Sequence, residues 1–138
     1  MPNKVLDSFA LIAYFRDESG AEIVEKLLVT ASKNDTPLYM TDVNYAEVKY
    51  SIVKKDGLAA WKKVAKILQS LPIDYHSTTR VLADSAADFK AQYKISLADA
   101  FAAALAKEKD AELVTGDPEF KPLEKEIEII WLNMVSIQ

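Results

Sequence analysis

The sequence predicts an α/β fold in a single domain, residues 1–138, with a mostly parallel sheet covered by helices on both faces. Short apolar runs alternate with longer segments of helical periodicity along the chain, as expected for strand–helix–strand units. The 138 residues can bury one core, and they contain no repeat and no Gly/Ser-rich linker. Hydrophobic residues make up 50% of the chain and charged residues 28%, an ordinary globular composition.

In the first half of the chain, residues 4–6 form a short apolar run that ends at Asp7, as a buried strand would. Helices are predicted over 8–16 and 20–32, and residues 38–40 are predicted to form a strand. The next helix is predicted over 42–55, where Val43, Ala46, Tyr50 and Val53 recur at helical spacing. Gly57 interrupts this pattern, and a further helix is predicted over 58–71.

In the second half, Pro72 ends that helix and residues 73–75 are predicted to form a short strand. Two more helices are predicted over 78–92 and 96–109. Residues 112–114 are predicted to form a strand followed by a turn at TGDP, and residues 127–132 to form a closing strand.

Composition narrows the chemistry and the expected location. The chain has no cysteine, which excludes disulfides and thiolate catalysis and favours a cytoplasmic protein. It has one histidine, His76, so a zinc site of His and Cys ligands is excluded and a Ser-His-Asp relay is barely possible. No apolar run reaches the ~18–20 residues of a membrane helix, and the N-terminus has no small-residue cleavage site. We therefore expect neither a membrane segment nor a signal peptide.

The net charge of −4 conceals an uneven distribution of charged residues. Residues 49–66 hold six lysines and one aspartate, whereas residues 108–128 hold eight acids and three lysines. Solvated helix faces account for such runs. A basic stripe beside an acidic centre is also typical of a metal-dependent enzyme that acts on a phosphodiester, and Lys49, Lys54 and Lys55 are candidates to contact the phosphates of such a substrate.

Four acids are predicted to converge. Asp7 and Asp117 follow two of the strands, Glu47 lies in the second turn of the helix after LYMT, and Asp99 lies in the first turn of the apolar helix LADAFAAALA. In an open parallel sheet, reactive groups gather beyond the carboxyl ends of the strands. Ser8 and Thr115, next to Asp7 and Asp117, could hydrogen-bond a carboxylate or a metal-bound water.

Each acid also has a purely structural interpretation. Asp7 and Asp117 can cap the helices that follow them, the latter with Pro118 in the first helical position. Asp99 can form a capping box with Ser96, and Glu47 can pair with Lys54 or Tyr50. Capping does not explain why several acids begin helices at one edge of a sheet. Clustered carboxylates repel one another unless a divalent cation lies between them, and hard oxygen ligands suit Mg²⁺ or Mn²⁺.

These residues also carry a resemblance to a known family. The chain resembles the PIN domain, and more narrowly the small VapC-type toxins of toxin–antitoxin pairs, over nearly its whole length. The matching segments are VLDSFALIAYF, TDVNYAEVKYSI, SLADAFAAALAK and LVTGDPEF, in this order.

The resemblance implies a three-layer α/β/α sandwich with about five strands ordered 3-2-1-4-5 and an Mg²⁺-dependent endoribonuclease in which Mn²⁺ can substitute. It implies that Asp7, Glu47, Asp99 and Asp117 hold the metal and that Ser8 and Thr115 support them. It also implies an RNA substrate, a homodimer and a small VapB-type antitoxin. Some relatives carry a further acid near the third or fourth position. Here Ala98 offers none and Glu119 is the nearest candidate, which leaves one or two metal ions open.

Other functions remain as alternatives. Haloacid-dehalogenase-type phosphatases need a second aspartate two residues after the first, where this chain has Phe9, and receiver domains need an acceptor aspartate that IDYH fits poorly. A PIN-like module that binds RNA or protein without cutting it has no chemical need for four acids. An RNA-processing nuclease that is not a toxin is the alternative within the family.

Overall fold

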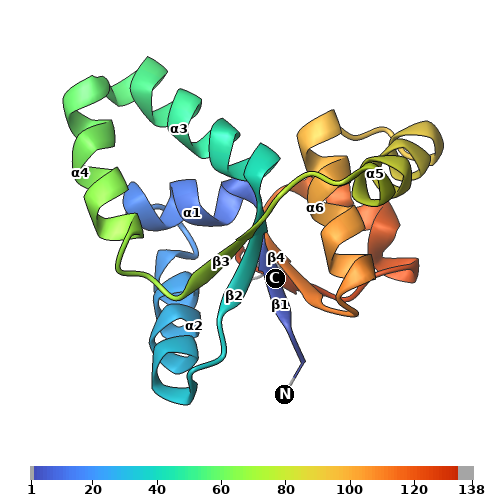
Figure 1. Ribbon diagram of the computed structural model, residues 1–138, viewed down its shortest axis with the longest axis horizontal. Coiled ribbons are helices and arrows are strands. Elements are labelled where there is room, and N and C mark those ends of the chain that lie inside the picture. The colour runs from blue at the N-terminus through green and yellow to red at the C-terminus, as the bar shows by residue number, and fades with distance from the viewer. Residues whose placement is uncertain (1, 134–138) are drawn as a thin grey trace.

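The computed structural model describes residues 2–133 (Figure 1). Residues 1 and 134–138, which the single-domain prediction includes, lie outside the described residues. The strands are β1 (Lys4–Leu6), β2 (Leu38–Thr41), β3 (Ile73–His76), β4 (Glu112–Thr115) and β5 (Ile129–Trp131). They form one parallel sheet in the order β3-β2-β1-β4-β5. The predicted α/β class and strand order are confirmed.

Helices cover both faces of this sheet (Figure 1). On one face lie α1 (Ser8–Phe15), α2 (Ala21–Asn34), α3 (Asp42–Asp56) and α4 (Leu58–Leu68). On the other lie α5 (Arg80–Gln92), α6 (Leu97–Glu108) and the 3₁₀ helix η1 (Pro118–Lys125). The six predicted helices are present, with ends that differ by up to three residues.

The segment after β4 differs from the prediction. The expected turn at TGDP continues into η1. The Asp117 side chain caps this helix by accepting a hydrogen bond from the Glu119 amide at 2.9 Å, and the ring of Pro118 restricts its φ to a helical value. Pro122 lacks the amide hydrogen that an α-helix needs, which favours the shorter 3₁₀ form. The Ile127 amide still donates to the Leu123 carbonyl. The predicted strand 127–132 is therefore shortened to β5.

Successive strand residues point to opposite faces and feed two separate cores. Val5 and Leu113 pack with α5, α6 and η1, whereas Leu6 and Val114 pack with α1 to α4. Helix α6 approaches the sheet through fully buried alanines, including Ala100 and Ala103. Small side chains let its backbone come close to the sheet, which brings its first turn to the carboxyl edge of β1 and β4.

Candidate active site

The buried polar side chains of residues 2–133 are concentrated in one place. All lie at the carboxyl edge of the sheet or in the first turns of the helices that follow it; they are Asp7, Ser8, Thr41, Asn44, Asp99 and Thr115. Buried polar groups destabilise a fold unless they are paired. Their gathering at one edge marks that edge as the candidate functional site.

Asp7 is the centre of this site and caps α1, as one interpretation of the sequence predicted. Its Oδ1 accepts a hydrogen bond from the Ala10 amide at 2.9 Å, and its Oδ2 accepts one from the Thr115 hydroxyl. The Thr115 Oγ1 in turn accepts from the Asp117 amide at 3.0 Å. Thr115 therefore ties the end of β4 to the end of β1 and orients two acids at once.

Glu47 is placed by a second network. Its carboxylate accepts a hydrogen bond from the Ser8 hydroxyl, rather than pairing with Lys54 or Tyr50 as the structural interpretation allowed. Asn44 lies one turn earlier on α3 and is fully buried. Its amide group donates to the Ser8 Oγ at 3.5 Å and to the Ala98 carbonyl at 3.2 Å. Asn44 therefore joins α1, α3 and the first turn of α6.

Asp99 faces other carboxylates across the site. Oxygen atoms of Asp99, Asp117 and Glu119 lie within 4.8 Å of one another. The predicted capping box is present in one direction, since the Asp99 amide donates to the Ser96 Oγ at 3.1 Å. Helix capping and the clustering of carboxylates therefore occur together, because the helix N-termini that need caps lie at one edge of the sheet.

Burial and mutual repulsion perturb two of these acids. Burial raises the pKa of Asp7 to about 8, against the lowering effect of its hydrogen bonds to Thr115 and Ala10 and with a further rise from the charges of Asp99 and Asp117. The pKa of Asp99 is raised to about 7, mainly by burial and then by the charges of Asp117 and Glu47. The four predicted acids therefore form one electrostatic unit.

The arrangement fits a divalent cation. Three carboxylates offer oxygen atoms in one small group, which is the donor chemistry that Mg²⁺ and Mn²⁺ prefer. A cation there would favour the charged forms of Asp7 and Asp99, whose pKa values are raised. The group includes Glu119 and does not include Asp7 or Glu47, each of which accepts a hydrogen bond from a hydroxyl.

Sequence reasoning missed two buried residues of the site, Thr41 and Asn44, and left Glu119 as a doubtful candidate. Asn44 resembles an ordinary polar residue on an amphipathic helix, although it stands one turn before Glu47, which was a usable signal. Thr41 is the cap of α3: its Oγ1 accepts from the Asn44 amide nitrogen at 2.9 Å.

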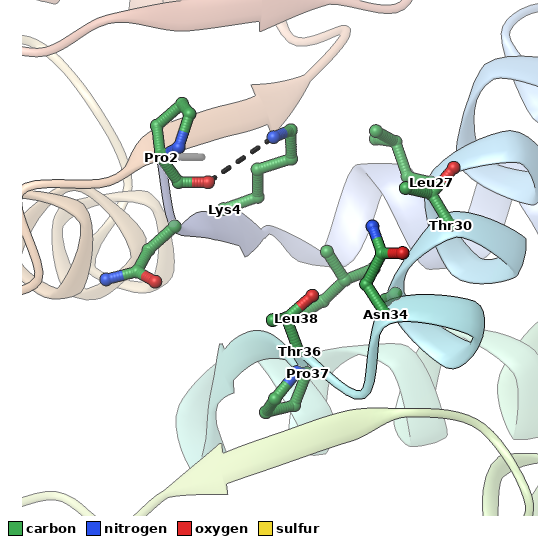
Figure 2. Close-up of a pocket in the computed structure, with 10 residues that line it drawn as sticks. Pro2, Lys4, Leu27, Thr30, Asn34, Thr36, Pro37 and Leu38 are labelled. Carbon is green, nitrogen blue, oxygen red and sulfur yellow. Dashed lines mark hydrogen bonds between the residues drawn. The ribbon is translucent and has the colours of Figure 1, made fainter.

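The three candidate RNA-binding lysines do not form one surface. Lys49 lies over the Trp61 ring, 5.8 Å from its centroid, on the side of α3 that faces α4. Lys54 and Lys55 are exposed in the last turn of α3 and line an open pocket. The amino edge of the sheet carries a different, small pocket of about 80 Å³ between α2 and β2. There Lys4 reaches back to the Pro2 carbonyl (Figure 2) and pairs with Glu112.

Comparison with family models gives a match to the PIN domain over residues 4–126. Comparison with curated proteins gives no match. No helix within residues 2–133 is both long and apolar enough to cross a membrane.

Several solved structures share the fold. A chain of VapBC2 from Rickettsia felis, solved with a DNA fragment from its promoter, has a TM-score of 0.73 at 15% identity and covers 94% of this chain and 98% of its own. VapC20 from Mycobacterium tuberculosis, a toxin that cleaves the sarcin–ricin loop, has a TM-score of 0.71 at 14% identity with coverage of 88% and 95%. FitAcB from Neisseria gonorrhoeae has a TM-score of 0.62 at 16% identity with coverage of 92% and 96%. At these identities the likeness concerns the fold.

Proposed function

Because this chain belongs to the PIN domain family, we propose that it is an Mg²⁺-dependent endoribonuclease that hydrolyses RNA phosphodiester bonds. The observation that carries the proposal is the meeting of acids from residues 7 to 119 at one edge of the sheet, where the pKa values of Asp7 and Asp99 are raised. Helix capping alone would not require these acids to lie at one edge of the sheet. Mn²⁺ is expected to replace Mg²⁺ because both accept hard oxygen ligands.

In this proposal Asp7, Glu47, Asp99 and Asp117 hold the metal, with Glu119 beside them. Bound Mg²⁺ would supply an activated water and would neutralise charge on the phosphate. The chain itself fixes the ligands: Thr115 and the Ala10 amide orient Asp7, and Ser8 orients Glu47. Such hydrogen bonds keep the carboxylates in place before substrate arrives.

The test is cleavage of a labelled RNA by purified protein with Mg²⁺ or Mn²⁺. Asp99→Asn is expected to abolish cleavage while the fold persists, because one repulsive charge is removed from the buried site. Asp84→Asn, which neutralises an exposed acid on α5, is the matched control and should cleave as the wild type does. Full activity of Asp99→Asn, or activity that survives EDTA, contradicts the proposal.

We further propose that the protein is the toxin of a VapBC-type pair, that it acts in the cytoplasm as a homodimer, and that a small antitoxin blocks its acids. The fold shared with chains from toxin–antitoxin complexes supports this role. Expression in a bacterial host should arrest growth, and co-expression of the neighbouring open reading frame should relieve the arrest. An RNA-processing nuclease would cleave RNA in vitro without arresting growth, and a protein that binds RNA without cutting it would fail the cleavage assay.

A further inference from the structure

One face of α3 leads away from the acids. Glu47, Tyr50, Ser51 and Lys54 recur three to four residues apart and therefore share this face. Helix α1 lies beside it: the Ser8 hydroxyl bonds Glu47 at one end. At the other end, the Arg16 side chain donates to the Ser51 carbonyl at 3.4 Å and to the Asp56 carboxylate at 3.1 Å. The seam between α1 and α3 thus begins at the candidate active site and ends near Lys54.

At the far end of the seam is an open pocket of about 410 Å³ lined by Arg16, Tyr50, Ser51, Lys54 and Lys55. Tyr50 is 59% exposed. Asp56 balances the charge of Arg16, whereas neither lysine forms an ion pair with any part of residues 2–133. The pocket therefore combines an accessible aromatic ring with two unbalanced positive charges.

We propose that this pocket binds the single-stranded RNA substrate a few nucleotides from the scissile bond, with Lys54 and Lys55 on backbone phosphates and Tyr50 stacked on a base. Glu47 and Lys54 are seven residues apart on one helix, about 10 Å along its axis. An RNA strand that lies along the seam would therefore contact both. This inference rests on the proposed ribonuclease function.

The chemistry favours a single strand over other anions. Aromatic stacking requires bases that are not already paired in a duplex, and a ring flanked by cations is the usual platform for unpaired nucleotides. The pocket also assigns different roles to the lysines of the lysine-rich segment, residues 49–66. Lys54 and Lys55 are assigned to RNA, whereas Lys49 packs on Trp61 and the exposed Lys62 and Lys63 lie on α4.

The test measures the affinity for a short, unstructured, fluorescently labelled RNA by anisotropy as a function of salt, in EDTA so that no cleavage occurs. Each phosphate contact contributes about 0.7 to the slope of log affinity against log salt for a single strand. The Lys54→Gln/Lys55→Gln variant should therefore lose about 1.4 from that slope. The Lys62→Gln/Lys63→Gln variant removes the same charge from α4 and should keep the wild-type slope.

Tyr50 gives a second readout. Tyr50→Ala should weaken RNA binding by about fivefold or more, and Tyr50→Phe, which keeps the ring, should restore it. The proposal is overturned if both lysine pairs change the slope equally, or if Tyr50→Ala binds as the wild type does. A Tyr50→Ala variant that alters sedimentation but not RNA affinity also overturns it, because the pocket would then contact a second copy of the chain.

These results separate the pocket from the nuclease itself. If the pocket assignment alone is wrong, the wild type still binds and cleaves RNA with Mn²⁺ while the pocket variants behave like it. If the wild type neither binds nor cleaves RNA, the proposed function fails and the pocket proposal fails with it.

Discussion

Replacing Asp7 by asparagine should change how the stability of the metal-free protein depends on pH. Burial raises the pKa of Asp7 from 3.8 to about 8. Between these values the folded protein holds a proton on Asp7 that the unfolded chain has released. Raising the pH therefore favours the unfolded chain, so the free energy of unfolding falls across this window. Below pH ~4 both states hold the proton, and above pH ~8 both have released it.

The size of the effect follows from the two pKa values. With 3.8 for the unfolded chain and about 8 for the fold, Asp7 lowers the free energy of unfolding by about 2.5 kcal/mol between pH ~5.5 and pH ~7.5. The asparagine side chain of the variant would not titrate. Its oxygen can still accept from the Ala10 amide, and its NH₂ group can donate to the Thr115 hydroxyl oxygen. Between pH ~5.5 and pH ~7.5 the free energy of unfolding of the variant should therefore fall by about 2.5 kcal/mol less than that of the wild type.

Urea unfolding in EDTA at several pH values measures this difference, provided that the m-value stays constant. Asp84→Asn, at an exposed position, is the control and should follow the wild-type curve. At neutral pH, Mn²⁺ should stabilise the wild type more than Asp7→Asn, because only the wild type offers the full set of carboxylate ligands. Parallel pH curves for the wild type and Asp7→Asn would refute the raised pKa of this carboxylate.

Three further predictions concern the same structure. Mn²⁺ affinity measured by calorimetry should rise at least about tenfold from pH 6 to pH 8, because Asp7 and Asp99 must lose protons to bind it; equal affinities would contradict the raised pKa values. Asn44→Ala should destabilise the fold by about 1–3 kcal/mol in urea unfolding and should slow RNA cleavage by freeing Ser8; unchanged cleavage would show that Ser8 is oriented without it. Ala103→Leu should lower the free energy of unfolding by about 1–3 kcal/mol, because this position is fully buried; a neutral effect would mean that α6 packs loosely.

The fold was predictable because its signals are local and agree with one another. Short apolar runs such as 4–6 and 112–114 alternate with periodic segments, and this alternation leaves few topologies open. Element ends were less predictable where the chain balances two hydrogen-bonding choices. The turn after Asp117 is an example: Pro122 and the Asp117 cap together favour a 3₁₀ helix, which the hydrophobic periodicity of the sequence does not predict.

The positions of three of the acids were predictable because Asp7 and Asp117 follow strands and Asp99 lies in the first turn of a helix, whereas Glu47 lies in the second turn of α3. Which carboxylate oxygen atoms lie closest together could not be predicted, because this depends on side-chain geometry. Glu119 joins Asp99 and Asp117 only because η1 turns directly after β4. Asn44 was missed because its role depends on Ala98 and Ser8, which are distant in the sequence.

The hydrogen bond between Thr115 and Asp7 spans 108 positions of the chain. The ribosome makes β1 first, yet β1 lies between β2 and β4 in the sheet. A nascent chain that stops short of β4 leaves one flank of β1 open and lacks both Thr115 and Asp117. In the proposed nuclease, the acids at the carboxyl edge of the sheet would therefore come together only after β4 and Asp117 have been made.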